Sequence, residues 1–431
     1  MSVVVDCTMD TAMKNIVILA TGGTIAGAGE QGKDIGYKSG ALEAQTLIDA
    51  VPELKNVANI LVEQVCNINS DDITSEIWIL LARRIKELAS EGFGTSRENV
   101  DGFVIMHGTD TMEETAFFLS LTLDGFAPNV AENVAENAAR SVILSEVEGA
   151  RKNVTGNVVC DASGNATGNV AKPVILTGSM RPATAAEPDG PANLLFAVQS
   201  AVRLSSSLAT CHAREGGHLP FVDSTESSAS HSGLSSRPQC RDHRLSFANN
   251  VPVFVAFAGK LMDARTVQKI HANDLDAFEE ISSELSCPPL VIPDPVPGGH
   301  HPLLKAKNSF NVSSLRELPR VSVLYFNADA DAELVRFAAE RSAGLVIAGA
   351  GAGEFSKSWA LAIANVIADK NIPVVISTRI NCGSIVPEQL LVPGTIASYG
   401  LPPAKAAVLL RLALTVTNNP VVIQDIYHMY R

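Results

Sequence analysis

The sequence predicts an α/β protein in which a linker joins two units, each built around a parallel sheet. Short unbroken apolar runs recur along its 431 residues, and such runs are typical of strands buried on both faces of a parallel sheet. Segments whose apolar residues have helical spacing alternate with these runs, which implies that helices cover the sheets. A chain of this length has room for two or more domains.

The first predicted strand leads into a turn that is rich in glycine and threonine. Residues 15–29 read NIVILATGGTIAGAG, in which the apolar run 16–19 predicts the strand and TGGT at 21–24 predicts the turn. Glycine lets the backbone turn sharply and approach a ligand, and ligands of open α/β sheets bind beyond the carboxyl ends of strands. The hydroxyls of Thr21 and Thr24 are therefore candidates for ligand contacts, although an ordinary turn that contains threonine would look the same.

A polar, glycine-rich segment follows at 30–40. We expect it to form a flap over the turn, hinged at Gly27 and Gly29. Its one aromatic residue is Tyr37, which would be a surface side chain if the segment were an ordinary loop.

The next elements are a short helix at 41–51, a strand at 60–68 and a helix at 77–88, each predicted from its apolar pattern. Ser70 and Asp71 lie between the last two. We expect them to cap the amino end of the following helix, where serine and acidic side chains are favoured.

The first arrangement then repeats. The apolar run 103–106 predicts a strand that opens into HGTDT, which contains Thr109 and Asp110, and an apolar stripe from 112 to 121 predicts a helix. Further strands are predicted at 173–176 and 252–257.

Two segments look like insertions, near 127–171 and 205–246. Both are far longer than usual connections, the first has a low-complexity appearance and the second has no periodic element, so we expect surface excursions or disordered segments. The second contains residues that could bind zinc, but their spacing matches no paired-ligand motif, and we predict no metal site. These residues are Cys211, His212, His218, Cys240 and His243.

The pattern divides the chain into an N-terminal domain at 1–308, a linker at 309–320 and a C-terminal domain at 321–431. Strands and helices alternate in the C-terminal domain, and its last helix is expected at 404–417. The other elements expected there are strands at 321–326, 344–348 and 373–377 and helices at 332–343 and 359–369.

Composition narrows the class of partner. The formal net charge of −13 argues against nucleic acid and anionic membranes, since both favour clustered Lys and Arg. No apolar run approaches the length of a membrane span, the opening residues lack the pattern of a secretory signal, and the seven cysteines are scattered. We expect a cytoplasmic protein with reduced thiols.

The two threonine-bearing turns predict a kind of chemistry. A threonine hydroxyl is a weak nucleophile that needs a base to accept its proton and donors to hold the oxyanion formed on the attacked carbonyl. Glycine-rich turns can supply backbone N–H donors, and a partly desolvated lysine paired with an acid can be the base.

Two long motifs carry a family resemblance, ILATGGTIAG at 18–27 and DGFVIMHGTDTMEETA at 101–116. On these residues the chain resembles the bacterial-type L-asparaginase/glutaminase family, across nearly its whole length apart from the two insertions. The resemblance implies a larger N-terminal flavodoxin-like domain, a smaller C-terminal α/β domain and no cofactor. Further similar segments lie at 63–72, 178–195, 261–278 and 405–414.

The resemblance also implies catalytic roles. Thr24 would be the nucleophile that attacks the side-chain amide and becomes the acyl-enzyme, and Tyr37 would orient it or help to deprotonate it. Thr109, Asp110 and Lys269 would form a second Thr–Lys–Asp arrangement. Without the resemblance, Lys269 reads as a solvated lysine on a helix face.

Substrate binding and assembly follow from the same resemblance. Ser70 and Asp71 would bind the α-carboxylate and α-ammonium groups of an amino acid, with Asp110 also on the ammonium. The family is usually a homotetramer built of tight dimers, so we expect a homodimer or homotetramer in which the partner's C-terminal domain completes each site. In that domain the family's Asn aligns with Asp329, and its acid falls near Glu388.

Three functions stay open at this point. The first is an L-asparaginase that releases ammonia from L-asparagine, the second is a mixed glutaminase-asparaginase, and the third is a catalytically silent homologue that binds an amino acid or a partner. A nucleotide-binding Rossmann protein is disfavoured, because TGGTIAG lacks the G-x-G-x-x-G spacing.

Overall fold

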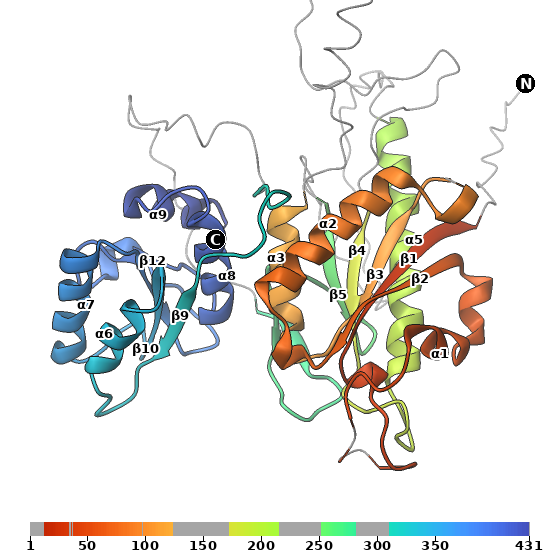
Figure 1. Cartoon of the computed structure of the whole chain (residues 1–431), viewed down its shortest axis with the longest axis horizontal. Coiled ribbons are helices and arrows are strands. Elements are labelled where there is room, and N and C mark those ends of the chain that lie inside the picture. Colours follow the sequence, from red (N-terminus) through yellow and green to blue (C-terminus); the bar gives the residue numbers. More distant parts are fainter. Residues whose placement is uncertain are drawn as a thin grey trace, which may run out of the picture.

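The chain folds into two domains, each with a mainly parallel sheet and flanking helices (Figure 1). The computed structural model describes residues 13–33, 36, 38–96, 98–123, 172–214, 251–281 and 310–430. The larger sheet belongs to the N-terminal part and the smaller sheet to the C-terminal part, which confirms the predicted fold class. The first predicted insertion and most of the second lie outside the described residues.

The larger sheet has six strands in the order β2-β1-β3-β4-β5-β6. Neighbours run parallel except β5 and β6, which are antiparallel. The order reverses at β1, because β2 lies on one side of it and the later strands lie on the other, and ligands of such sheets bind at this reversal. The strands are β1 (Lys14–Gly22), β2 (Ala58–Ile68), β3 (Gly102–Met106), β4 (Val174–Thr177), β5 (Val253–Phe257) and β6 (Lys260–Asp263).

Both faces of this sheet are buried, which explains its unbroken apolar runs. Along β1, Val17 and Leu19 join the apolar core on one face, with α2 and α3, whereas Ile16 and Ile18 join the core on the other, with α1 and α5. The helices are α1 (Ala44–Asp49), α2 (Ser75–Glu91), α3 (Met112–Thr122) and α5 (Gly190–Arg214).

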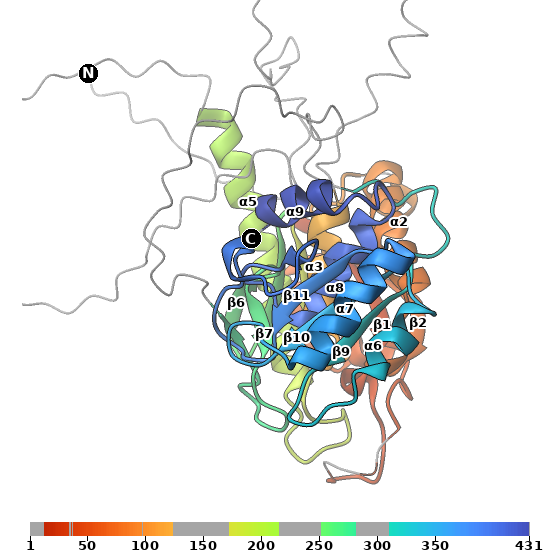
Figure 2. The same ribbon diagram turned by 90° about the vertical axis from the view of Figure 1, so that its left-hand side faces the viewer.

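The smaller sheet has four parallel strands in the order β12-β11-β10-β9. Helices α6 and α7 pack on one face around Trp359, and α8 covers the other, where it also contacts α3 of the larger domain (Figures 1 and 2). One apolar core therefore continues across both domains. The elements are β9 (Val321–Tyr325), β10 (Gly344–Gly349), β11 (Val374–Thr378), β12 (Ile396–Ala397), α6 (Glu333–Ala339), α7 (Lys357–Lys370), α8 (Pro403–Ala413) and α9 (Pro420–Met429).

The segment that joins the domains is anchored to the larger one. The amide of Phe310 donates to the Leu121 carbonyl at 2.8 Å. The guanidinium of Arg83 on α2 donates to the carbonyls of Ser313 at 3.2 Å and Leu315 at 3.0 Å. The connection thus holds the C-terminal domain against α2 and α3.

Two sequence predictions about helices are wrong. The helix predicted at 404–417 is not the last, because α9 follows it: Pro420 occupies its first turn, and the Asn419 side chain accepts from the amide of Val421 at 2.9 Å. Residues 205–214, predicted to be aperiodic, continue α5. The hydroxyls of Ser205 and Ser206 donate back to the Val202 carbonyl, at 2.9 and 3.0 Å, so these serines are compatible with helix.

Among the described residues, no helix is both long and apolar enough to cross a membrane.

Candidate active site

The loops that follow β1, β2 and β3 meet in a tight cluster. Gly23 has a φ of +78°, and a methyl group at this position would overlap the Cα and amide nitrogen of Gly108. A methyl group at Gly108 would in turn lie 2.7 Å from the Cβ and Oγ of Ser70. The amide of Gly23 also donates to the Ile68 carbonyl at 2.8 Å. The TGGT and HGTDT turns are therefore in backbone contact at the reversal of the sheet.

Replacing Gly23 by alanine tests this close approach. The added methyl group combines left-handed strain with backbone overlap, so we expect Gly23→Ala to lower the free energy of unfolding by about 3 kcal/mol. Urea denaturation followed by circular dichroism measures the loss. Gly32→Ala is the matched control, since Gly32 has a φ of +81° and no atom of the described residues lies within 4 Å of the added methyl group. Equal losses in both variants would show that the loop contact does not constrain the fold.

The two threonines of the first turn have different surroundings. Thr21 is buried, and its hydroxyl donates to the Met106 carbonyl at 3.0 Å, which ties β1 to β3. The prediction that this hydroxyl faces a ligand is therefore wrong. Thr24 begins the 3-10 helix η1 (Thr24–Ala26), is half-buried and directly follows Gly23 at the contact with the second turn.

Lys269 reaches the second turn from a distant part of the chain. It ends the short strand β7 (Val267–Lys269), which pairs antiparallel with β8 (Phe278–Glu280). Its Nζ donates to Thr109 Oγ1 at 2.9 Å and to Asp110 Oδ1 at 2.6 Å. Its side chain is only 14% exposed. The interpretation as a solvated lysine on a helix face is wrong, because β7 is a strand that packs against α3.

This arrangement can move a proton. Thr109 is buried, so its hydroxyl exchanges few hydrogen bonds with water, and the ammonium of Lys269 is its partner. Hydrogen bonds from an ammonium are stronger than neutral ones, and the carboxylate of Asp110 balances the charge. Once this ammonium has given up a proton, the Lys269 amine can take a proton from the hydroxyl and return it.

Ser70 and Asp71 begin the 3-10 helix η3 (Ser70–Asp72) at the end of β2. The prediction that they cap α2 is wrong. The backbone is extended at Ile73 and Thr74, which separates η3 from α2, and Thr74 is the N-cap residue.

The hydroxyl of Ser70 is buried. Ser70 is 2% exposed, and its Oγ has no hydrogen-bond partner among the residues that the structure describes. Its carbonyl accepts from Thr111 Oγ1 at 2.8 Å, so its backbone is fixed to the HGTDT segment. Leaving a buried hydroxyl unsatisfied is costly, which suits a group that binds a ligand.

A buried hydrogen-bond chain holds the HGTDT turn in place. Trp78 Nε1 donates to Thr115 Oγ1 at 2.8 Å, and that oxygen lies 2.9 Å from His107 Nε2. His107 Nδ1 lies 2.7 Å from the Gly108 carbonyl. Because a carbonyl can only accept, we assign the proton to Nδ1, so that Nε2 accepts from Thr115. Burial lowers the pKa of His107 to about 4, which keeps the ring neutral.

His107 makes stability depend on pH below neutrality. The unfolded chain protonates this residue near pH 6.5, whereas the folded chain does so only near pH 4. Between these values the unfolded state holds more protons, so the free energy of unfolding falls as the pH drops, by about 3 kcal/mol in total. Urea denaturation across this range measures the slope. His107→Gln should remove this component, and an unchanged slope in that variant would contradict the assignment.

Backbone hydrogen bonds hold the two ends of the predicted flap together. Ala28 and Lys38 form an antiparallel bridge with hydrogen bonds of 3.0 and 2.9 Å, and the amide of Gly29 donates to Thr184 Oγ1 at 3.0 Å. Tyr37 lies outside the described residues. Its role therefore stays a prediction, as does hinge motion of the flap.

Two C-terminal residues implied by the resemblance are exposed in this chain. Asp329 has a φ of +62°, a left-handed conformation that Asp and Asn tolerate better than most residues. Glu388 lies in the 3-10 helix η6 (Pro387–Gln389). A contribution of either residue to a partner's site stays a prediction.

No group of three or more His, Cys, Asp or Glu side chains could hold a metal ion within the part of the chain that the structure describes. The side chains of the cysteines and histidines that the sequence analysis considered for zinc lie outside that part.

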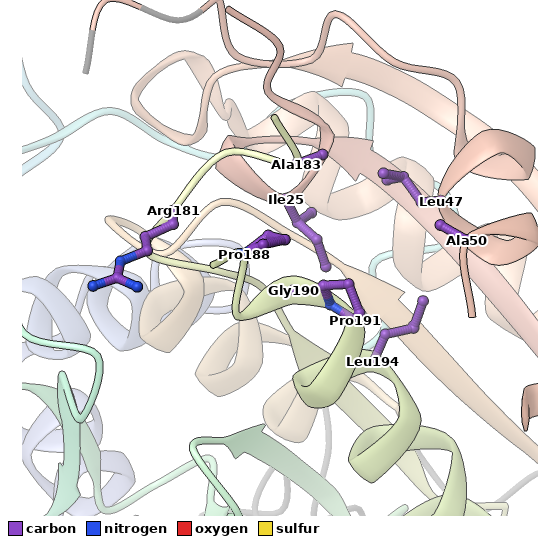
Figure 3. Close-up of a pocket in the computed structure, with 9 residues that line it drawn as sticks. All are labelled: Ile25, Leu47, Ala50, Arg181, Ala183, Pro188, Gly190, Pro191 and Leu194. Atoms are coloured by element: carbon purple, nitrogen blue, oxygen red, sulfur yellow. The ribbon is translucent and has the colours of Figure 1, made fainter. Parts of the chain in front are cut away.

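A pocket of about 270 Å³ lies between η1, α1 and the start of α5 (Figure 3). Its lining is largely apolar, and the charged end of Arg181 points away from the apolar side chains. Neither Thr24 nor Lys269 lines it, so it is separate from the cluster described above. The lining residues are Ile25, Leu47, Ala50, Arg181, Ala183, Pro188, Gly190, Pro191 and Leu194.

The amino-acid sequence matches a known protein family in both of its domains. Residues 15–131 and 165–211 match the family described as Asparaginase, N-terminal, and residues 320–427 match the Glutaminase/Asparaginase C-terminal domain. The L-asparaginase 2 of Escherichia coli (strain K12) is 31% identical over 97% of this chain and 94% of its own length. The glutaminase-asparaginase of Pseudomonas fluorescens biotype A is 27% identical over 97% of this chain and 91% of its own length.

A solved structure agrees with these matches. The crystal structure of the probable cytoplasmic L-asparaginase from Campylobacter jejuni superimposes with a TM-score of 0.65 at 30% identity, covering 96% of this chain and 99% of that one. Both family segments are present in order, and similarity spans nearly the full length of the relatives. The chain therefore belongs to the asparaginase family.

Proposed function

We propose that this protein is an amidohydrolase that converts L-asparagine and water into L-aspartate and ammonia. The observation that carries the proposal is the contact of Lys269 Nζ with Thr109 Oγ1 and Asp110 Oδ1, in a turn that touches the turn of Thr24. Family membership supports the class of reaction, and the name L-asparaginase 2 of two bacterial relatives supports the substrate.

In the proposed first step, Thr24 Oγ1 attacks the carbonyl carbon of the substrate's side-chain amide. The hydroxyl proton is passed to the amide nitrogen, which leaves as ammonia, and an acyl ester on Thr24 results. Backbone N–H groups of the glycine-rich turns hold the oxyanion during attack. Tyr37 is proposed to orient the Thr24 hydroxyl.

In the second step, water attacks the ester and releases L-aspartate. The arrangement of Thr109, Lys269 and Asp110 accepts a proton from the attacking group and returns it to the leaving group. Neutral Lys269 takes the proton through the Thr109 hydroxyl, and the Asp110 carboxylate stabilises the ammonium that forms.

The head group of the substrate is proposed to bind at the end of β2. The buried Ser70 Oγ would donate to the α-carboxylate, which supplies the partner that this hydroxyl lacks among the described residues. The carboxylates of Asp71 and Asp110 are both exposed and would accept from the α-ammonium.

An ammonia-release assay with asparagine and glutamine in parallel tests the proposal. Release from asparagine alone supports an asparaginase. Comparable release from both supports a mixed glutaminase-asparaginase, a candidate that the name of the Pseudomonas relative favours. No release from either amide, by folded protein, would overturn the proposal and leave a silent amino-acid-binding homologue.

The proposal extends to assembly and location. We expect a homodimer or homotetramer, in which Asp329 and Glu388 lie near the partner's site, and sedimentation velocity measures the assembly. A cytoplasmic location is proposed from the sequence, and the name of the Campylobacter relative supports it, whereas the Haemophilus influenzae relative is named periplasmic. The domain limits of 1–308 and 321–431, with a linker at 309–320, are part of the same proposal.

A further inference from the structure

A buried lysine of the C-terminal domain contacts the segment that carries Lys269. Lys405 lies in the first turn of α8 and is 0% exposed. Its Nζ donates to the carbonyls of Ala264 and Arg265, each at 3.0 Å, and of Val267 at 2.5 Å. An ammonium has three protons to donate, so these carbonyls use all of them. The last of the three lies two residues before Lys269.

A glutamate of the larger domain holds the other end of the same segment. The backbone amide of Lys269 donates to Glu113 Oε2 at 2.7 Å. Glu113 lies in the first turn of α3, directly after the turn that contains Thr109 and Asp110. The backbone of Lys269 is thus fixed to the helix that follows the two residues contacted by its side chain.

The strand is short, and its hairpin also packs through apolar side chains: Val267 on β7 and Phe278 on β8 are both buried in the core. Within the described residues, β7 has three residues and pairs with β8 alone, in a two-stranded sheet apart from the larger one. A two-stranded hairpin is marginally stable in water unless it packs on something else. The contacts from Lys405 and Glu113 add to this packing and fix the backbone of the segment against α8 and α3.

The chemistry of Lys405 favours a specific purpose over simple packing. Burial disfavours its charge and lowers its pKa to about 8, although the nearby Glu113 carboxylate raises it. A cation in the first turn of a helix also opposes the helix dipole. An apolar residue would avoid both penalties, but it would leave the backbone carbonyls of the 264–267 segment without their donor.

We propose that Lys405 and Glu113 are positioning residues, which hold β7 so that the Lys269 amine meets Thr109. The inference rests on the proposed function, because it assigns Lys269 a part in proton transfer. Neither residue contacts the Thr109 hydroxyl in the structure described, so both act through Lys269. Small misplacements of a catalytic group lower turnover strongly, whereas the substrate's own contacts are unchanged.

A double-mutant cycle tests this inference. We expect Lys405→Met to lower kcat for asparagine by about 10- to 100-fold and to change KM by less than about 3-fold. In a Lys269→Met background the same substitution should cause no further loss, because the residue to be positioned is gone. Lys370→Met is the matched control, since Lys370 is exposed in the last turn of α7, on the face of the smaller sheet opposite α8, and it should keep the wild-type kcat. Circular dichroism and thermal melting confirm that each variant is folded.

A second pair of variants keeps the test decisive if Lys405→Met does not fold. Glu113→Gln retains an oxygen that accepts from the Lys269 amide, whereas Glu113→Ala does not. We expect the glutamine variant to keep most of the turnover and the alanine variant to lose about 10-fold or more, with KM little changed.

The outcomes separate the inference from the function on which it rests. Wild-type kcat in folded Lys405→Met, additive losses in the double variant, or equal losses in the two Glu113 variants would each overturn the positioning role. Wild-type turnover in Lys269→Met would instead overturn the proposed role of Lys269 in the reaction.

Discussion

Thr24→Ala is expected to abolish asparagine hydrolysis while leaving the protein folded. The substitution removes the hydroxyl that would form the acyl-enzyme, and loss of a covalent nucleophile lowers kcat by about 10⁴-fold or more. Thr24 is half-buried in a loop, so we expect the free energy of unfolding to change by less than about 1 kcal/mol. Ammonia release at saturating asparagine, together with urea denaturation of the same sample, checks both expectations.

Thr21 provides a control within the same turn. Its hydroxyl bonds the Met106 carbonyl inside the sheet, so Thr21→Ala should lower stability by about 1–2 kcal/mol and leave kcat near the wild-type value. Both substitutions remove a threonine hydroxyl, at positions three residues apart. We expect Thr24→Ala to lose turnover and keep its stability, and Thr21→Ala to lose stability and keep its turnover. Full turnover in Thr24→Ala would remove Thr24 from its proposed role.

Lys269→Met should depress turnover far more than substrate binding. Methionine retains much of the apolar stem but cannot exchange a proton with the Thr109 hydroxyl at 2.9 Å, and loss of a positioned base lowers kcat by about 10²- to 10⁴-fold. The substrate's head group is proposed to contact Ser70, Asp71 and Asp110 rather than Lys269 itself, so we expect KM to change less than about 3-fold. Steady-state kinetics with asparagine separates the two parameters.

Two comparisons guard this interpretation. Lys269→Met also leaves the Asp110 carboxylate without its ion-pair partner, although Asp110 is exposed and water can solvate it. Asp110→Asn should therefore be measured beside it. A larger loss of kcat in Asp110→Asn than in Lys269→Met would indicate that Asp110, and not Lys269, is the essential group. A rise in KM with unchanged kcat in Lys269→Met would contradict proton transfer and indicate a binding role.

Much of the fold could be predicted because the signals are local. An unbroken apolar run followed by Gly and Thr marks β1 and β3, and their burial on both faces is a property of each strand's own residues. The order of strands and helices then implied two parallel sheets. The helix α9 was missed although its signal, Asn419 before Pro420, stands in the sequence.

The site was predicted less completely, because hydrogen bonds across the fold leave no periodic pattern. Thr21 and Thr24 look alike in the sequence, and only the pairing of β1 with β3 uses the Thr21 hydroxyl for the Met106 carbonyl. Ser70 precedes a helical pattern, as an N-cap residue would. In the structure it lies in η3, among the loops that follow β1 and β3, and its hydroxyl is buried.

By itself, the sequence determined the longer parallel strands of both sheets, most of the helices and the two glycine-rich turns, since each depends on residues close together in the chain. The tertiary structure decided which side chains meet there. Lys269 lies 160 residues from Thr109 and on a strand too short to show a period, so family resemblance could name it but local pattern could not. Its place depends on packing of β7 against α3, on the contact from Glu113 of the same domain, and on contacts from Lys405 of the C-terminal domain, which require the two domains to pack on one core.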